Sequence, residues 1–281
     1  MEKSFQTLAL LGSGSFAKIY KAKRKEDNHL FAVKEIYFRS LKQNEKKQIV
    51  NEVNIMRQLS SSYLVRYIQR EVDQSNGVLW IVMEYCTGGD LFRFLCDTKD
   101  LIPEEIIWIY TAQINEGLKY LHSKKIIHRD VKPHNILFVD QYRMRVKIAD
   151  FGLSTVNENF SNTYAGSPYY MCPEMVQSLP YNEAADQWSL GCLCFQLTSR
   201  VPPFDAEQYH ELKDKILYAD FPTLPSVYSL LLLELINALL NKNPQQRPTS
   251  LQTSQHFRIE LALYDLKLRY RYISTNIGNW K

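Results

Sequence analysis

The spacing of apolar residues changes along the chain, and each spacing predicts a different kind of element. Apolar residues alternate or run without a break over residues 5–11, 17–22, 30–33 and 78–85, which predicts strands. A further short strand is expected at residues 145–149. Elsewhere apolar residues recur at intervals of three and four, which predicts helices at residues 42–59, 103–122, 184–198, 207–218, 227–240 and 251–263.

Two of these helices carry further signals. The helix at 103–122 is expected to begin with Pro103 at its first position, followed by Glu104 and Glu105. The helix at 184–198 is apolar around most of its circumference. A helix of that kind has no polar face for water, so we expect it to be buried.

The order of the elements indicates the fold class. Strands are concentrated in the first third of the chain and helices in the rest, which is typical of an α+β fold with two lobes. A glycine pair at 88–89 marks a change of composition and predicts a hinge over residues 84–89. We expect an N-lobe at about residues 1–84 and a C-lobe at 90–264. The remaining residues, 265–281, form a basic, aromatic tail without heptads.

Composition narrows the classes of partner. The chain has 281 residues, of which 45% are hydrophobic and 23% charged, and this is the composition of a globular protein. A net charge of +4 without a one-sided basic stripe argues against a nucleic-acid partner. We expect neither a signal peptide nor a membrane span, because no apolar run reaches the required length. The five cysteines lack C-x-x-C spacing, which favours reduced thiols in a cytosolic or nuclear compartment.

Two glycines, Gly12 and Gly14, lie at the tip of the first predicted hairpin. A G-x-G pattern is more often a sign of a dinucleotide site. Here no helix follows the glycines, no acid stands about 20 residues further on, and Ala17 takes the place of a third glycine. A Walker-type loop is excluded because the G-K-[ST] sequence is missing. A hairpin that covers phosphates with its backbone N–H groups fits what is present.

One polar stretch, His128 to Asn135, is followed fifteen residues later by Asp150. Asp130 could orient an attacking hydroxyl, and Lys132 could lie against a transferred phosphate. Asn135 and Asp150 supply hard oxygen ligands, the type that Mg²⁺ selects. Each residue alone is common on a polar surface loop. Together they favour phosphoryl transfer from a metal-bound nucleotide.

A lysine and a glutamate upstream form a second candidate pair. Lys34 follows the strand at 30–33, where a lone lysine is usually a solvated charge. Glu52 lies on the flank of the apolar face of the helix at 42–59. An unpaired buried carboxylate is costly, so Glu52 needs a cationic partner. Lys34 is the candidate for that role.

Further motifs continue the same order toward the C-terminus. Over about residues 5–260 the chain resembles the eukaryotic protein kinases. The segment 166–174 is most similar to the NIMA-related kinases. The matching motifs, in order, are Gly12 with Gly14, Phe31-Ala32-Val33-Lys34, Glu52, His128-Arg129-Asp130 with Asn135, Asp150-Phe151-Gly152, Cys172-Pro173-Glu174, Asp186 to Gly191, and Arg247-Pro248.

The resemblance implies a fold and an activity. The fold would be that of a two-lobed protein kinase spanning residues 1–264, with a small antiparallel sheet and one main helix in the N-lobe. The larger C-lobe would be mostly helical. The activity would be that of a serine/threonine kinase that uses ATP and Mg²⁺ on protein substrates. The resemblance further implies a monomeric domain in the cytoplasm, at the cytoskeleton or in the nucleus, with cytoskeletal or cell-cycle partners.

The resemblance also implies roles for individual residues. Asp130 would accept the proton of the substrate hydroxyl, with Lys132 beside it. Lys34 would hold the α- and β-phosphates and pair with Glu52. Asp150 and Asn135 would bind the metal ions. The nucleotide would contact Leu11, Gly12, Ser13, Gly14, Ile19, Ala32, Met83, Glu84, Cys86, Asp90 and Leu137.

Structural and regulatory residues are implied as well. Met56, Tyr67, His128 and Phe151 would stack on one another, and Asp186 would anchor this stack. Glu174 would pair with Arg247. Thr163 would be the activating phosphorylation site, because it lies three residues before Gly166, the spacing found in the resembled family. Its phosphate would bind Arg129. The other hydroxyl-bearing candidates after Val156 are Ser161, Tyr164, Ser167 and Tyr169.

Two other functions compete with an active protein kinase. One is a pseudokinase, which would bind nucleotide or act as a scaffold without phosphoryl transfer. The other is a small-molecule phosphotransferase of similar fold. Three positions depart from the kinase pattern, namely Ala17, Val131 and Cys172. None of them removes a catalytic atom, so the intact polar set favours the enzyme.

Overall fold

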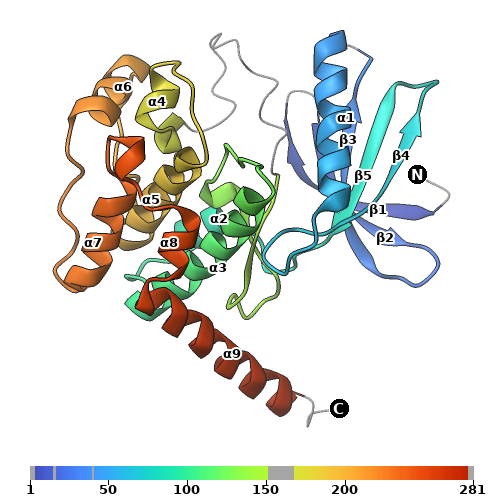
Figure 1. The fold of residues 1–281 in the computed structure, drawn as a ribbon. Helices are drawn as coiled ribbons and strands as arrows, with labels where there is room; N and C mark the ends of the chain where they lie inside the picture. Colours follow the sequence, from blue (N-terminus) through green and yellow to red (C-terminus); the bar gives the residue numbers. More distant parts are fainter. Residues whose placement is uncertain (1–3, 15–16, 40, 151–167, 278–281) are drawn as a thin grey trace. The chain divides into compact units, whose positions relative to one another are not determined.

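A computed structural model of the chain describes residues 4–14, 17–39, 41–150 and 168–277 (Figure 1). Side chains at positions 44, 45, 48, 51, 52 and 270–277 lie outside this description. The chain separates into two compact units. Of the described residues, those up to 87 belong to the N-terminal unit, and residues 88–150 and 168–277 belong to the C-terminal unit.

The N-terminal unit is built on an antiparallel sheet with the strand order β1-β2-β3-β5-β4. Its core lies on one face of the sheet, where the rings of Phe5 and Phe31 meet edge to face at 5.7 Å. The elements are β1 (Phe5–Ser13), β2 (Ala17–Arg24), β3 (Leu30–Tyr37), α1 (Gln43–Gln58), β4 (Tyr67–Asp73) and β5 (Val78–Glu84).

Two features of this sheet differ from the sequence-based prediction. The third strand continues to Tyr37, so Lys34 lies inside it and is buried, not a solvated charge at its end. The strand β4 was not predicted. It forms an edge of the sheet and its residues 69–72 are exposed, so no apolar alternation marks it in the sequence.

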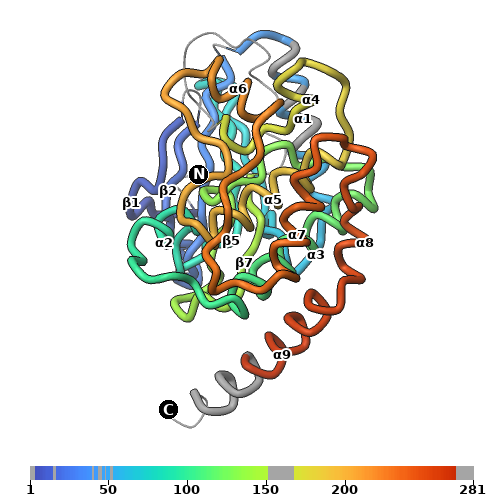
Figure 2. Tube along the Cα trace, turned by 90° about the vertical axis from the view of Figure 1, so that its left-hand side faces the viewer, coloured from blue at the N-terminus to red at the C-terminus, as the bar shows by residue number. Residues whose placement is uncertain are grey.

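The C-terminal unit is mostly helical. Its helix α5 packs against both α3 and α7, and α9 packs against α3 (Figures 1 and 2). A small ladder of β6 (Ile136–Phe138) and β7 (Val146–Ile148) lies beside α3. The helices are α2 (Leu91–Asp97), α3 (Glu104–Ser123), α4 (Pro173–Val176), α5 (Ala184–Ser199), α6 (Tyr209–Tyr218), α7 (Leu230–Leu239), α8 (Ser250–Ser254) and α9 (Phe257–Ile277).

The predicted burial of the helix now called α5 is confirmed, since every residue from Ala185 to Thr198 is buried. The predicted first residues of two other helices, α3 and α7, were wrong, and the N-cap residues show where these helices begin. Pro103 is the N-cap of α3 and not its first residue. The α7 helix begins at Leu230 and not at 227, because the Ser229 hydroxyl accepts a hydrogen bond from the N–H of Leu232 at 3.3 Å.

The helix expected at 251–263 is two helices. The first, α8, has a capping box formed by Thr249 and Gln252 and ends at Ser254. The second, α9, begins at Phe257 and runs to Ile277, so helical backbone extends into the predicted tail. The short helix α2 was not predicted either. Among the described residues no helix combines the length and the apolar character needed to cross a membrane.

Candidate active site

A buried carboxylate on α5 holds the polar loop that leads into β6. Asp186 accepts hydrogen bonds from the backbone N–H groups of His128 and Arg129, each at 2.8 Å, and contacts His122 Nε2 at 2.8 Å. These bonds accompany a left-handed backbone at Arg129, with φ of 72°. A non-glycine residue persists in that region only where its surroundings hold it. The predicted anchoring of His128 by Asp186 is therefore confirmed.

Three of the predicted functional side chains meet in this loop. The Lys132 ammonium lies 2.7 Å from Asp130 Oδ2. The Asn135 amide donates hydrogen bonds to Asp130 Oδ2 and to the Asp130 carbonyl, both at 2.8 Å. The Asp130 side chain stays 27% exposed and that of Lys132 14%. The carboxylate is thus oriented by two neighbours and remains open to an incoming group.

In the ladder of β6 and β7, the backbones of the two predicted metal ligands, Asn135 and Asp150, lie close together. The N–H of Ala149 donates to the Asn135 carbonyl at 2.8 Å, and Asp150 follows directly. Asp150 has a left-handed backbone, with φ of 55°. Because the Asn135 nitrogen faces Asp130, its side-chain oxygen faces the other way. An amide oxygen and a carboxylate are the donors that Mg²⁺ prefers, so this pair fits a magnesium ion.

Five of the predicted nucleotide residues of the N-terminal unit, Gly12, Ile19, Ala32, Lys34 and Met83, share one face of its sheet. In the ladder, Gly12 pairs with Ile19, and Ile19 pairs with Lys34. On the next rung Ala32 pairs with Met83. Directly paired residues, and residues two apart on one strand, point to the same side of a sheet. This face is opposite the one that carries the Phe31 core.

Lys34 is 8% exposed, on a strand interior where charged residues are rare. At the hairpin tip, by contrast, Leu11, Ser13 and Gly14 are exposed. The turn there is closed by the Gly14 N–H, which donates to the Ala17 carbonyl at 2.8 Å. A buried ammonium beside an open glycine-containing turn is a donor set that suits phosphate groups.

The residues expected at the hinge have well-defined partners. Glu84 makes two hydrogen bonds with the backbone of Arg66. Its N–H donates to the Arg66 carbonyl at 3.0 Å, and its side-chain carboxylate accepts from the Arg66 N–H at 2.6 Å. Cys86 is buried. In the C-terminal unit Asp90 forms a β-bridge with Leu137, and its carboxylate caps α2 by accepting from the Arg93 N–H at 2.8 Å. The capping role of Asp90 was missed in the sequence.

Several predictions concern residues outside the description. The side chain of Glu52 is one of them, so its pairing with Lys34 stays a prediction. The others lie between positions 151 and 167. They are Phe151, Gly152, Ser161, Thr163, Tyr164 and Ser167.

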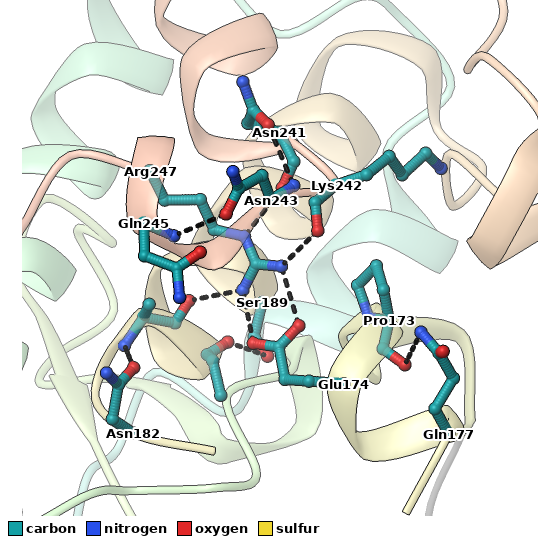
Figure 3. Close-up of polar contacts among 12 residues, drawn as sticks. Pro173, Glu174, Gln177, Asn182, Ser189, Asn241, Lys242, Asn243, Gln245 and Arg247 are labelled. Atoms are coloured by element: carbon teal, nitrogen blue, oxygen red, sulfur yellow. Dashed lines mark hydrogen bonds and ion pairs between the residues drawn. The ribbon is translucent and has the colours of Figure 1, made fainter. Parts of the chain in front are cut away.

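Glu174 and Arg247 form the predicted buried pair (Figure 3). Nη1 and Nη2 of Arg247 contact the two carboxylate oxygens at 2.6 and 2.8 Å. The guanidinium also donates to the carbonyls of Asn241, Ala184 and Lys242, at 2.8, 3.0 and 3.4 Å. All five of its N–H donors thus have an acceptor. The pairing predicted from the resemblance is confirmed.

An aromatic pair beside the catalytic loop was not predicted. The His134 ring stacks on the Phe92 ring of α2, with centroids 3.9 Å apart and planes at 18°. Burial in this stack, together with the nearby Lys132 charge, lowers the pKa of His134. The two residues lie far apart in the chain, and no spacing pattern connects them.

Comparison with known proteins agrees with this arrangement of loop, ladder and buried ion pair. Residues 5–257 match the model of the protein kinase domain, and the chain belongs to that family. Similar proteins include the probable serine/threonine-protein kinase nek2 of Dictyostelium discoideum, 38% identical over 276 residues. The serine/threonine-protein kinase Nek2 of Homo sapiens is 38% identical over 258 residues. The predicted resemblance to the NIMA-related kinases is thereby confirmed.

These relatives are longer than the chain. The matched region covers 95% of this chain and 66% of the Dictyostelium protein, and 88% of this chain and 58% of the human protein. The G2-specific protein kinase fin1 of Schizosaccharomyces pombe is 35% identical over 90% of this chain and 38% of its own length.

Proposed function

We propose that this chain is a serine/threonine protein kinase that transfers the γ-phosphate of ATP to hydroxyl groups of protein substrates. The observation that carries the proposal is the cluster of Asp130, Lys132 and Asn135, formed in a chain that belongs to the protein kinase domain family. The set of side chains that this chemistry needs is complete in the sequence.

Asp130 is the residue that we assign to the substrate hydroxyl. Within the described part of the chain, the contacts to its side chain come from Lys132 and from Asn135 and fall on Oδ2. We therefore assign Oδ1 to accept the hydroxyl proton as the hydroxyl oxygen attacks the γ-phosphorus of ATP, whose bond to the bridging oxygen breaks and releases ADP. Lys132 then stabilises the negative charge that develops on the phosphoryl oxygens. Asn135 keeps the carboxylate in one rotamer, so that little reorganisation is needed.

We propose further that the nucleotide binds with Mg²⁺, which neutralises phosphate charge when bound. Asn135 and Asp150 would hold the metal ions through their side-chain oxygens. Lys34, paired with Glu52, would contact the α- and β-phosphates. The backbone of Gly12 and its neighbours would cover the phosphates. The adenine would lie against the face that carries Ile19, Ala32 and Met83, with hinge contacts from Glu84 and Cys86. Leu137 is a further residue that we propose contacts the nucleotide.

The test is transfer of radiolabelled phosphate from MgATP to a generic protein substrate. We expect transfer by the natural chain and a loss on the order of a hundredfold in Asp150→Asn. Nucleotide binding should be measured separately, as the shift in melting temperature with ATP and Mg²⁺. A pseudokinase would show the shift without transfer, and this result would contradict the proposal.

We propose that phosphorylation of Thr163 activates the enzyme. Arg129 supports this proposal from within the described residues: it is exposed and its guanidinium lies 5.7 Å from the centre of the Tyr181 ring. A phosphate adds about −1.5 to −2 charges and three acceptors, enough for charge-assisted bonds to Arg129. After incubation with MgATP we expect Thr163→Ala to stay weakly active and Ser161→Ala to become fully active. Phosphosites mapped by mass spectrometry would identify the modified residue.

We propose a reducing compartment, such as the cytoplasm, as the location of the protein. All five cysteines carry free thiols, which supports this assignment. Burial raises the pKa of the Cys172 and Cys194 thiols to about 12, so neither is a reactive thiolate at neutral pH. Fractionation of cells that express a tagged chain would test the location.

A further inference from the structure

The helix α9 has two apolar faces between residues 257 and 268, and among the described residues one of them is buried. Ile259, Ala262 and Leu266 are buried, and α9 packs against α3. These three residues lie within about 60° of one another on a helix with 3.6 residues per turn. This face explains why α9 is held to the C-terminal unit.

The opposite face carries a second apolar row, the α9 stripe, made of Phe257, Leu261, Tyr264 and Leu268. Their exposed fractions are 55%, 43%, 60% and 46%. The intervals of four, three and four residues are those of a heptad seam, in which all four side chains lie on one side of the helix. Figure 1 shows α9 projecting from the other helices of the C-terminal unit. Such a row of large exposed side chains is typical of a contact surface.

The charges beside the stripe alternate in sign along each flank. Glu260 and Lys267 lie on one flank, and Arg258 and Asp265 lie on the other. In heptad terms the first two residues occupy g positions and the other two e positions. Each flank therefore carries one acid and one base, seven residues apart.

An antiparallel pair of stripes would match these charges. We place the two-fold axis of this pair between Leu261 and Tyr264. Leu261 of one copy then faces Tyr264 of the second copy, and Tyr264 of the first copy faces Leu261 of the second. Glu260 then lies between the same two apolar layers as Lys267 of the second copy. By the same symmetry Arg258 lies opposite Asp265 of the second copy. The two-fold axis repeats both contacts, so four pairs of opposite charge surround the seam.

A parallel pair of stripes would bring together other residues. In that orientation g residues face e residues of the next heptad, so Glu260 would lie beside Asp265 of the second copy. Two carboxylates at this distance repel each other. The charge pattern thus selects the antiparallel orientation.

We propose that the α9 stripe is a self-association surface, which binds a second copy of this chain in antiparallel orientation. This inference departs from the monomer that the kinase resemblance implies, and it does not depend on the proposed activity. The stripe spans 12 residues, about 18 Å of helix, so the interface is of the small and reversible class. Arg258 also lies 3.9 Å from Glu104 of its own chain, so Glu260 with Lys267 is the more important charge pair.

The first test measures association of the 281-residue chain by analytical ultracentrifugation. We expect a monomer–dimer equilibrium between about 10 μM and about 1 mM, the range of a weak interface. Leu261→Glu should raise the dissociation constant on the order of a hundredfold, since both copies lose an apolar contact. The matched control is Leu8→Glu on β1, because Leu8 is 45% exposed and Leu261 is 43% exposed. This control should leave the association unchanged.

The second test uses charge exchange. Glu260→Lys alone and Lys267→Glu alone should each weaken self-association by about tenfold, because each places like charges opposite one another. An equimolar mixture of the two variants should associate like the natural chain, since each variant then meets the opposite charge. The double variant, with both exchanges, should also recover.

Specific results would overturn the inference. A chain that stays monomeric at every concentration would exclude the surface. In that case a lower melting temperature of Leu261→Glu would show that the chain's own residues cover the stripe. A dimer that Leu261→Glu leaves unchanged would place the contact elsewhere. Stronger association of Glu260→Lys would indicate the parallel orientation, and a mixture without recovery would reject the charge pairing.

Discussion

Two carboxylates in the C-terminal unit each contact a basic side chain, yet their surroundings differ. Asp130 lies 2.7 Å from Lys132, and the two side chains are 27% and 14% exposed. Glu174 lies 2.6 Å from Arg247, and their exposed fractions are 7% and 0%. The distances are nearly equal, so the distance between charges does not distinguish the roles of the two pairs.

What differs is how completely each pair is satisfied. Every N–H donor of Arg247 bonds to the Glu174 carboxylate or to a surrounding carbonyl. The Cζ atom of Arg247 lies 5.0 Å from the centre of the Trp188 ring. Nothing further can bind there without breaking a bond. Among the described residues, the Asp130 side chain is contacted at Oδ2 by Lys132 and Asn135, and it stays 27% exposed. We therefore expect the closed pair to contribute stability and the open pair to contribute activity.

The largest effect is expected from breaking the closed pair. Glu174→Gln leaves the Arg247 charge buried without its counter-ion, which should lower the free energy of unfolding by about 3–5 kcal/mol. Glu116→Gln is the matched control, because Glu116 contacts Lys119 in a pair that is partly exposed. The control should cost about 1 kcal/mol or less. Urea unfolding measures both values, and equal losses in the two variants would reject the distinction.

The contribution of Glu174 to the free energy of unfolding should depend on pH. Burial alone would raise the pKa of Glu174, but its hydrogen bonds and the Arg247 charge lower the pKa below the usual 4.5. A carboxyl with a lowered pKa in the folded state stabilises the fold above the unfolded-state pKa. This contribution is lost as the pH falls through the folded-state pKa. The difference between the natural chain and Glu174→Gln should accordingly be full at neutral pH and should narrow in acid.

The next effect concerns the open pair and the residues that we propose hold the metal ions and the phosphates. Asp130→Asn should reduce kcat by on the order of a hundredfold or more, about 2.7 kcal/mol in the barrier. Lys34→Met and Asp150→Asn should have losses of the same order. The melting temperature of Asp130→Asn should stay close to that of the natural chain, because its carboxylate is not buried. Near-normal turnover in any of the three would remove the role assigned to that residue.

A smaller effect is expected on the preference for substrate sequence. A third carboxylate, Asp90, could influence this preference, but it already caps α2. Kinases that prefer basic substrates usually have an acid directly after the catalytic-loop proline, and here His134 holds that position against Phe92. A basic residue three positions before the acceptor should therefore not be required, and Ser and Thr should be preferred to Tyr. Introducing an acid by His134→Glu should raise the preference for arginine at that position by up to about tenfold. A peptide library measures both enzymes. Dominant arginine with the natural chain would refute the assignment.

The smallest effect is expected beside the closed pair. The Lys242 ammonium donates to the Ile216 carbonyl at 2.7 Å and lies 4.1 Å from the centre of the Phe204 ring. Burial lowers the pKa of Lys242 from 10.5 to about 8. Between these values the unfolded chain binds more protons than the folded chain, so stability rises with pH across this window. Relative to Lys242→Met, the natural chain should gain stability from pH 7.5 to pH 9.5 by urea unfolding, since the methionine cannot titrate. If the difference in unfolding free energy between the natural chain and Lys242→Met did not change with pH, burial would not lower the pKa of this ammonium.

The sequence alone determined the elements with strong local periodicity and the identity of the catalytic loop. The apolar residues of α5 predicted a buried helix because burial on all sides leaves no polar face. Asp130, Lys132 and Asn135 could be recognised because they lie within one short stretch. In the same way Ser229 and Thr249 carry the side chains that cap helices, although the prediction for α7 did not use that signal.

Only the tertiary structure decided features that depend on residues far apart in the chain. The edge strand β4 exists because β5 supplies its hydrogen-bond partners, while its own exposed residues show no apolar pattern. The buried position of Lys34 follows from pairing with both neighbouring strands. The stacking of Phe92 on His134 and the exposure of the α9 stripe likewise depend on how helices pack. Periodicity reports which residues share a face, but which face is covered is decided by the elements that pack against it.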